Sequence, residues 1–143
     1  CTPALAKRPC QKQILAAKAF DATTTFGDRI SFVHIYIVEP HPKAPEVSPY
    51  SGKVWEAQYS TKSQPHTYEQ RCANARDTAA LVTGRQLMLV DDLTPGANNP
   101  IWCTYGTCPN CAFLIRRDGT VDTVQTWVDV SAMERAIRTL LAR

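Results

Sequence analysis

The apolar segment Phe32–Val38 consists of aromatic and aliphatic side chains, many of them β-branched, with one histidine, His34, among them. A half-solvated strand would alternate apolar and polar positions, so this pattern predicts a strand over 30–38 that is buried on both faces. Glu39-Pro40-His41-Pro42 follows at once, and its prolines end strand pairing and stiffen the exit. We therefore expect a carboxylate and an imidazole at the carboxyl-terminal edge of a sheet, where open α/β folds usually hold their sites.

Other elements follow from helical periodicity and turn chemistry. Pro9 suits the first position of a helix over 9–21, and Thr67-Tyr68-Glu69-Gln70 is a capping box for a helix over 68–82. Ser131-Ala132-Met133-Glu134 has the same form and predicts a last helix that continues through Leu141. Arg117-Asp118-Gly119-Thr120 predicts a hairpin turn. The remaining segments are predicted as strands at 86–90, 112–116 and 121–127, and as irregular stretches at 40–65 and 93–109.

The order of these elements resembles the thioredoxin core, in which a parallel β-α-β unit is followed by an antiparallel hairpin and a closing helix. The expected fold is thus α/β, a single thioredoxin-like domain over 1–143 with a central mixed sheet, a C-terminal β-hairpin and three flanking helices. The strand that normally precedes the first helix has no counterpart, since eight residues come before Pro9. Either that strand lies upstream of the given sequence or the sheet is completed differently, and a homodimer sharing the exposed sheet edge is one such arrangement.

Composition and charge narrow the class of protein. The chain of 143 residues is 44% hydrophobic and 20% charged, with a formal net charge of +3. Lysine and arginine are scattered, so nucleic acid is not an expected partner. No apolar stretch reaches the length of a membrane span and no signal-peptide pattern opens the chain. These features favour a soluble, cytoplasmic domain; a periplasmic or lipid-anchored location remains open if the protein has further sequence upstream.

Two of the six cysteines lie near the start of the chain. Cys10 falls in the first turn of the predicted helix, where free N–H groups, the helix dipole and nearby Lys7, Arg8 and Lys12 favour a thiolate. The functional interpretation is a reactive thiol, and the structural one is a small apolar residue at a helix–loop contact. Cys1 is a candidate to resolve an oxidised Cys10. A first residue of Cys also fits a mature lipoprotein, an N-terminal nucleophile or, as the interpretation we favour, a fragment boundary.

The other cysteines permit several interpretations. Cys108 and Cys111 form a CxxC that precedes a strand rather than opening a helix, so it is misplaced for a thioredoxin-type redox motif. A disulfide or a resolving role, plain thiols, and a zinc site that adds Cys103 and a fourth ligand such as His66 all stay open. Pro109 stands where thioredoxin-like folds place a cis-proline. Cys72 fits a core position of the second helix.

The acid–base candidates surround the end of the first predicted strand. His41 suits a general acid or base with Glu39 beside it, although a surface histidine and a local cap explain the same dipeptide. His34 fits a hydrogen-bonded core residue. His66 precedes the capping box and by itself fits a capping or surface histidine.

Taken together, these segments resemble the iodothyronine deiodinase family. Tyr36-Ile37-Val38-Glu39-Pro40-His41-Pro42 is similar to its Tyr-Ile-x-Glu-Ala-His-Pro, and Pro65–Arg71 is similar to its His-x-x-x-Glu-Asp-Arg. Asp92–Asn99 with Tyr105-Gly106 resembles the segment before its hairpin, so the similarity covers roughly 10–142. The resemblance implies a thioredoxin-like fold with Glu39, His41, His66 and Arg71 around a chalcogen. The family has selenocysteine where this chain begins Cys1-Thr2-Pro3-Ala4, which argues against iodothyronine as the substrate.

The sequence therefore predicts a thiol-dependent oxidoreductase that acts on a peroxide, a disulfide or an organohalide. Cys10 is the expected nucleophile, His41 the acid–base group oriented by Glu39, and Cys1 or the Cys108–Cys111 pair the resolving thiol. His66, Arg71, Asn99 and Pro109 are expected to bind substrate or support these groups. No bound cofactor is expected, and an external thiol such as thioredoxin or glutathione is the expected reductant. The alternatives are a non-catalytic binding or structural domain whose cysteines form disulfides or bind zinc, and a reductive dehalogenase.

Overall fold

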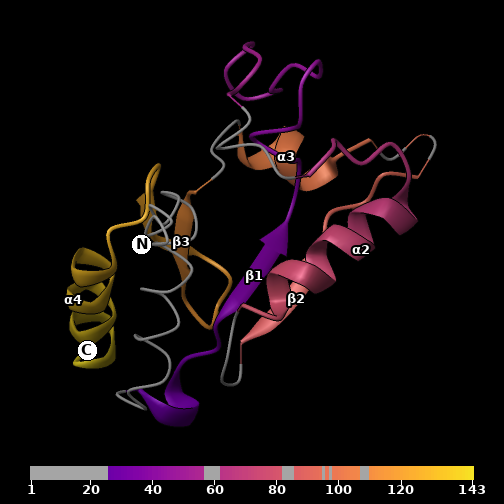
Figure 1. The fold of residues 1–143 in the computed structure, drawn as a ribbon. Helices are drawn as coiled ribbons and strands as arrows, with labels where there is room; N and C mark the ends of the chain where they lie inside the picture. Colours follow the sequence, from indigo (N-terminus) through magenta and orange to yellow (C-terminus); the bar gives the residue numbers. More distant parts are fainter. Residues whose placement is uncertain (1–25, 57–61, 82–85, 95, 97, 107–109) are drawn as a thin grey trace, which may run out of the picture.

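A computed structural model describes residues 26–56, 62–81, 86–94, 96, 98–106 and 110–143 of the chain (Figure 1). The described part is a mixed α/β structure with two small sheets and three α-helices. Its elements are η1 (Gly27–Arg29), β1 (Val33–Tyr36), α2 (Tyr68–Ala79), β2 (Leu87–Val90), α3 (Pro100–Tyr105), β3 (Ala112–Ile115), β4 (Val121–Gln125) and α4 (Val130–Leu141). The helix predicted at 9–21 lies outside the described residues.

The two sheets have two strands each. β1 and β2 pair in parallel with Val33 opposite Leu87 and Tyr36 opposite Val90. β3 and β4 form the predicted antiparallel hairpin, with a register shift between Leu114 and Ile115. Among the described residues no ladder joins β1 to β3, so the expectation of one central mixed sheet is wrong for this part of the chain.

Helix α2 packs on the parallel pair (Figure 1). It lies on the side of Tyr36, because that phenol is close enough to Arg71 and Asn74 to be influenced by both. On the opposite face, Val33, Ile35, Leu87 and Leu89 are 40–54% exposed. The prediction that this strand is buried on both faces is therefore wrong for the described residues: its apolar run is continuous, but a described helix covers one face only. The strand is also shorter than the predicted 30–38.

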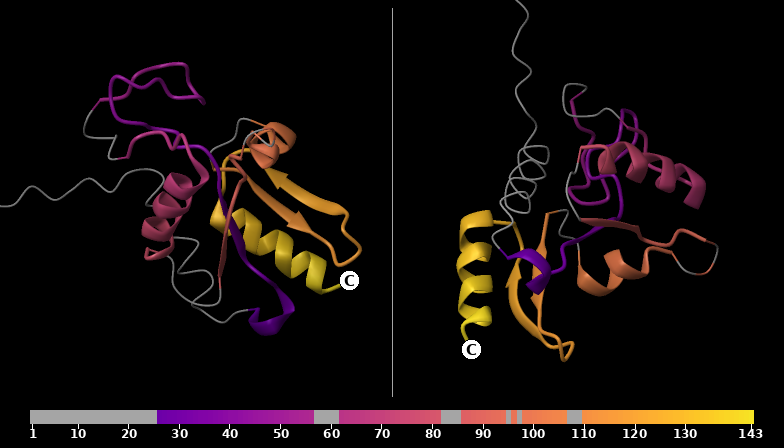
Figure 2. Two further views of the ribbon diagram at one scale, coloured as in Figure 1. Left: turned by 90° about the vertical axis from the view of Figure 1, so that its right-hand side faces the viewer. Right: turned by 90° about the horizontal axis from the view of Figure 1, so that it is seen from below.

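The hydrophobic core lies between the hairpin and the last helix, which Figure 2 shows side by side. Phe26, Leu114, Met133 and Ile137 are its buried members. Helix α4 ends where the sequence predicted, at Leu141, but it begins at Val130. Its N-cap is Asp129, whose carboxylate accepts from Ala132 N at 2.9 Å, so the capping box predicted at Ser131 is wrong. An aspartate two residues earlier caps the helix instead, so the helix begins two residues sooner than predicted.

The local predictions that rest on turn and cap chemistry hold elsewhere. Thr67 and Gln70 make both bonds of the capping box, and α2 begins at Tyr68 as expected, although it ends at Ala79 rather than at 82. In the hairpin, Gly119 has a φ of 86°, and the Asp118 carboxylate accepts from Thr120 N at 2.9 Å. That left-handed backbone conformation explains why Asp-Gly predicted the turn.

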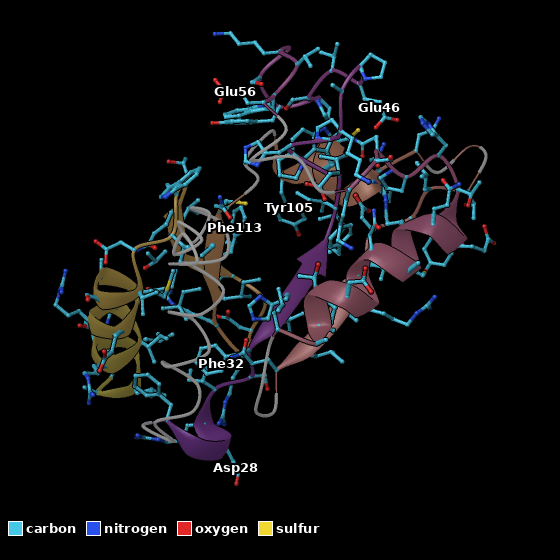
Figure 3. The ribbon with its side chains drawn as sticks, in the orientation of Figure 1. Asp28, Phe32, Glu46, Glu56, Tyr105 and Phe113 are labelled. Carbon is cyan, nitrogen blue, oxygen red and sulfur yellow. The ribbon has the colours of Figure 1, made fainter. Side chains whose placement is uncertain are left out.

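A short helix interrupts the segment 93–109, which the sequence predicted as irregular. Pro100 opens α3, and the buried carboxylate of Asp91 accepts from Ile101 N and Trp102 N at 3.0 Å each. The helix is thus capped by a residue that follows β2 and lies ten positions earlier in the chain, a contact that no local pattern reveals. At its other end the Tyr105 ring meets Phe113 of β3 at 5.2 Å (Figure 3), so α3 links the two sheets.

Candidate functional site

The exit of β1 is fixed by hydrogen bonds around Glu39. The Tyr36 hydroxyl donates to Glu39 Oε2 at 2.9 Å, and His41 N donates to Glu39 Oε1 at 3.4 Å. The side chain of Gln64 binds the main chain of Glu39 twice: it accepts from Glu39 N at 2.9 Å and donates to Glu39 O at 3.0 Å. Burial, and then the Glu39 carboxylate, raise the pKa of Tyr36, so this phenol remains a neutral donor. The carboxylate is held in place by the hydroxyl of a half-buried tyrosine.

The long loop that follows Glu39 folds back on the end of β1. Ser48 is 1% exposed and donates to Pro40 O at 2.6 Å. Pro42 and Lys62 form an isolated parallel bridge, and Lys43 N donates to Lys62 O at 2.9 Å. The described parts of the predicted loop 40–65 thus hold a definite conformation without a helix or a further strand. Lys62 is anchored in turn to Asp77 of α2 by an ion pair of 2.5 Å.

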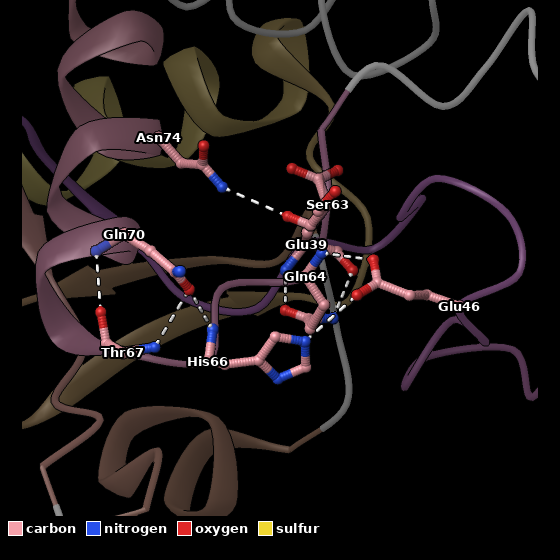
Figure 4. Close-up of polar contacts among 8 residues, drawn as sticks. All are labelled: Glu39, Glu46, Ser63, Gln64, His66, Thr67, Gln70 and Asn74. Atoms are coloured by element: carbon pink, nitrogen blue, oxygen red, sulfur yellow. Dashed lines mark hydrogen bonds and ion pairs between the residues drawn. The ribbon is translucent and has the colours of Figure 1, made fainter.

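This loop brings a second carboxylate to the site. Glu46 Oε2 accepts from Gln64 N at 2.7 Å, and Glu46 Oε1 lies 3.2 Å from His66 Nε2 (Figure 4). The His66 side chain is 74% exposed, whereas that of Glu46 is 27% exposed. The His66 main-chain amide donates to Gln70 Oε1 at 2.8 Å, which ties the residue to the start of α2. His66 is therefore held at both its backbone and its ring.

His41 is the other imidazole of this region. Its ring packs edge-on against the indole of Trp55, with centroids 4.2 Å apart and planes at 65°. The Trp55 indole N–H donates to Ser51 Oγ at 3.1 Å, so the indole is oriented by the loop. The Glu39 carboxylate reaches His41 through its main-chain amide, which donates to Glu39 Oε1. Glu39 therefore stabilises the backbone conformation at His41.

Arg71 belongs to a buried polar cluster between α2, β2 and α3. It is 1% exposed and donates to Asp91 O at 3.1 Å, to Asp92 O at 3.3 Å and to Asn99 Oδ1 at 2.5 Å. The structure therefore brings together Arg71 and Asn99, two of the predicted supporting residues. Burial lowers the pKa of Arg71, while the nearby Asp91 carboxylate opposes that shift. The guanidinium stabilises the packing of α3 against β2 and is not open to a ligand from solvent.

The cysteines divide into two sets. Cys1, Cys10 and Cys108 lie outside the described residues, as does Pro109, so the structure does not place the predicted nucleophile or the first two residues of the CxxC. Cys72 and Cys103 are free thiols, the first half-buried and the second exposed, and Cys111 is half-buried. Within the described ranges no group of three His, Cys, Asp or Glu side chains is arranged to hold a metal ion. His34, predicted as a hydrogen-bonded residue, contacts the Gln86 side chain through Nε2.

Sequence reasoning missed three residues of this site: Glu46, Gln64 and Trp55. They come from the segment 40–65 that the sequence predicted as irregular, and no period or spacing relates them to Glu39 or His66. A surface hollow of about 230 Å³ does occur, but it lies beside Phe26, Arg29 and Arg138, near η1 and α4. The hollow is separate from the exit of β1, and the candidate site is identified by its hydrogen bonds and not by a cavity.

No helix in the described part of the structure is long and apolar enough to cross a membrane. Comparisons with protein-family models, with curated proteins and with solved structures found nothing that matches this chain.

Proposed function

We propose that the chain is a thiol-dependent oxidoreductase with a thioredoxin-like arrangement, whose site lies at the carboxyl end of β1. The observation that carries the proposal is the hydrogen-bonded group formed by Glu39, Gln64, Glu46 and His66, with His41 beside it. Two imidazoles and two carboxylates at one strand end are the groups that move protons at neutral pH.

Topology supports Cys10 as the thiol that these groups serve. A helix that precedes a strand and packs on the same sheet usually runs antiparallel to it, so its first turn lies over the carboxyl end of that strand. Cys10 is in the first turn of the helix predicted at 9–21, and β1 follows at Val33. The apolar face of Val33, Ile35, Leu87 and Leu89 is available for the apolar side of such a helix. This placement is part of the proposal.

The chemistry follows from a thiolate beside a proton donor. The Cys10 thiolate attacks an electrophilic oxygen, sulfur or halogen atom, and the leaving group departs with the bonding electron pair and takes a proton from an imidazole. Cys10 is oxidised to a sulfenic acid, a mixed disulfide or a sulfenyl halide while the substrate is reduced. Cys1 or the Cys108–Cys111 pair displaces that group to form a disulfide, which an external dithiol reduces.

Alkylation tests the thiol first. We expect Cys10 to react with iodoacetamide with a midpoint well below the ordinary thiol value of about 8.5, mapped by mass spectrometry of the native protein. Cys103, an exposed thiol of the described part, is the internal control. A midpoint for Cys10 equal to that of Cys103 would refute an activated nucleophile and favour the non-catalytic scaffold.

Turnover then tests the reaction. The protein is assayed with dithiothreitol as reductant and with hydrogen peroxide, cystine or a model aryl iodide as the oxidised substrate. We expect one of the three to be consumed and Cys10→Ser to abolish its consumption; release of iodide from the aryl iodide would identify a reductive dehalogenase. Full activity in Cys10→Ser would contradict the proposal.

A further inference from the structure

We infer that Glu46 is a positioning residue for His66, and that this carboxylate–imidazole pair delivers the proton to the leaving group in the reaction proposed above, on which the inference rests. Neither the sequence pattern nor the family resemblance assigns Glu46 a role. The two oxygens of the Glu46 carboxylate have different partners, Gln64 N and His66 Nε2.

The Glu46 carboxylate has a fixed orientation. Its Oε2 accepts from the main-chain amide of Gln64 at 2.7 Å, so the second oxygen, Oε1, is directed at His66 Nε2, 3.2 Å away. A carboxylate that binds one ring nitrogen fixes the tautomer and the plane of the imidazole. Among the described contacts the Nδ1 atom has none, so it is the nitrogen left to exchange a proton with a substrate.

The backbone of His66 is held independently of its ring. Gln70 Oε1 accepts from His66 N at 2.8 Å, and the same Gln70 closes the capping box of α2 with Thr67. The imidazole is thus positioned from both sides, by the first turn of α2 and by the loop carboxylate. An ordinary exposed histidine has neither constraint.

Exposure assigns different roles to the two partners. The imidazole is 74% exposed and can meet a substrate, whereas the carboxylate is 27% exposed and sits behind it. Gln64 connects the pair to Glu39, since its own amide binds Glu46 while its side chain binds the Glu39 main chain. The pair therefore belongs to the exit of β1, as Figure 4 shows, and not to a separate patch of surface.

Glu46→Gln is the decisive variant, because an amide oxygen still accepts from Gln64 N while the negative charge beside His66 is removed. Asp77→Asn is the matched control: it removes the carboxylate that pairs with Lys62 at the end of the same loop, where the structure records no contact with His66. Circular dichroism checks that both variants keep the fold of the wild type. His66 is followed through its ring carbon–proton signals in NMR spectra, assigned by their loss in His66→Asn.

We expect Glu46→Gln to shift the His66 ring signals and to lower kcat by about tenfold with KM unchanged, a part of the roughly 10²–10⁴ that general acid–base catalysis supplies. Asp77→Asn should change neither quantity. Unshifted His66 signals in Glu46→Gln would overturn the pairing, and an unchanged kcat with shifted signals would overturn its role in proton delivery; both results leave Cys10 as the nucleophile. Full activity of Cys10→Ser would instead refute the proposed function together with this inference.

Discussion

Replacement of Arg71 by methionine tests whether the buried cluster stabilises the fold. Arg71 is 1% exposed and its guanidinium donates to Asp91 O, Asp92 O and Asn99 Oδ1. Each acceptor left without a donor inside the protein costs about 1–3 kcal/mol, and the 2%-exposed Asp91 loses a compensating charge. Against this loss, the methionine variant avoids the desolvation cost of burying a guanidinium, whose Nε has no hydrogen-bond partner. The net expectation is a loss of about 3–5 kcal/mol, because three acceptors at about 1–3 kcal/mol each outweigh that gain.

The measurement is urea unfolding followed by far-ultraviolet circular dichroism. Arg76→Met is the matched control, since Arg76 lies exposed on the same helix and should change the free energy of unfolding by less than about 0.5 kcal/mol. If Arg71→Met does not fold, Arg71→Lys keeps the charge with fewer donors and should be intermediate in stability. A loss below about 1 kcal/mol for Arg71→Met would refute the reasoning, because it would mean that the three acceptors are satisfied in another way.

Three further predictions test separate parts of the structure. The pKa of Tyr36 is raised by burial and by Glu39, so its stabilising contribution is complete below the unfolded value of about 10 and is lost as the pH rises above it. The free energy of unfolding should therefore fall less steeply from about pH 9 to about pH 11 in Tyr36→Phe than in the wild type, and equal slopes would contradict the raised pKa. Ile137→Ala should lower the free energy of unfolding by about 2–5 kcal/mol. Leu89→Ala, at a position 43% exposed, should lower it by less than half as much. Equal losses would show that a segment outside the described residues, or a second copy, covers the open face of β1 and β2. Thr67→Ala should cost about 0.5–2 kcal/mol, measured by the same urea titration, and no loss would contradict the capping box.

The elements that the sequence predicted well are those whose cause is local. A capping box needs one side chain and one amide three residues later, and a hairpin turn needs a glycine at a positive φ; both conditions can be read from four residues. The start of α4 was predicted less accurately, because Asp129 and Ser131 are both residue types that cap a helix and they stand two positions apart. Only the path of the chain decides which of them caps the helix.

The failures share a different cause, which is contact between distant segments. Helix α3 exists because Asp91 accepts from its first amides, and Asp91 is oriented by its place after β2. Glu46 reaches His66 because the loop is closed by the Pro42–Lys62 bridge and by the buried Ser48. The prediction that β1 is buried on both faces is wrong because an apolar run shows which faces of a strand could be buried, but not which neighbouring elements cover them. None of these contacts has a period or spacing in the sequence.

Burial separates two groups that the family resemblance had treated alike. It implied that Arg71 and His66 both line the site, and both do lie near the ends of β1 and β2. Arg71, however, is 1% exposed with its donors on Asp91, Asp92 and Asn99, while the His66 ring is 74% exposed with a shielded carboxylate behind it. A group that must meet a substrate needs an open face, and a group that holds a scaffold needs its bonds satisfied inside. The consequence is experimental: variants of Arg71 should act on the free energy of unfolding, and variants of Glu46 on kcat, so that the two effects can be measured separately in the same protein.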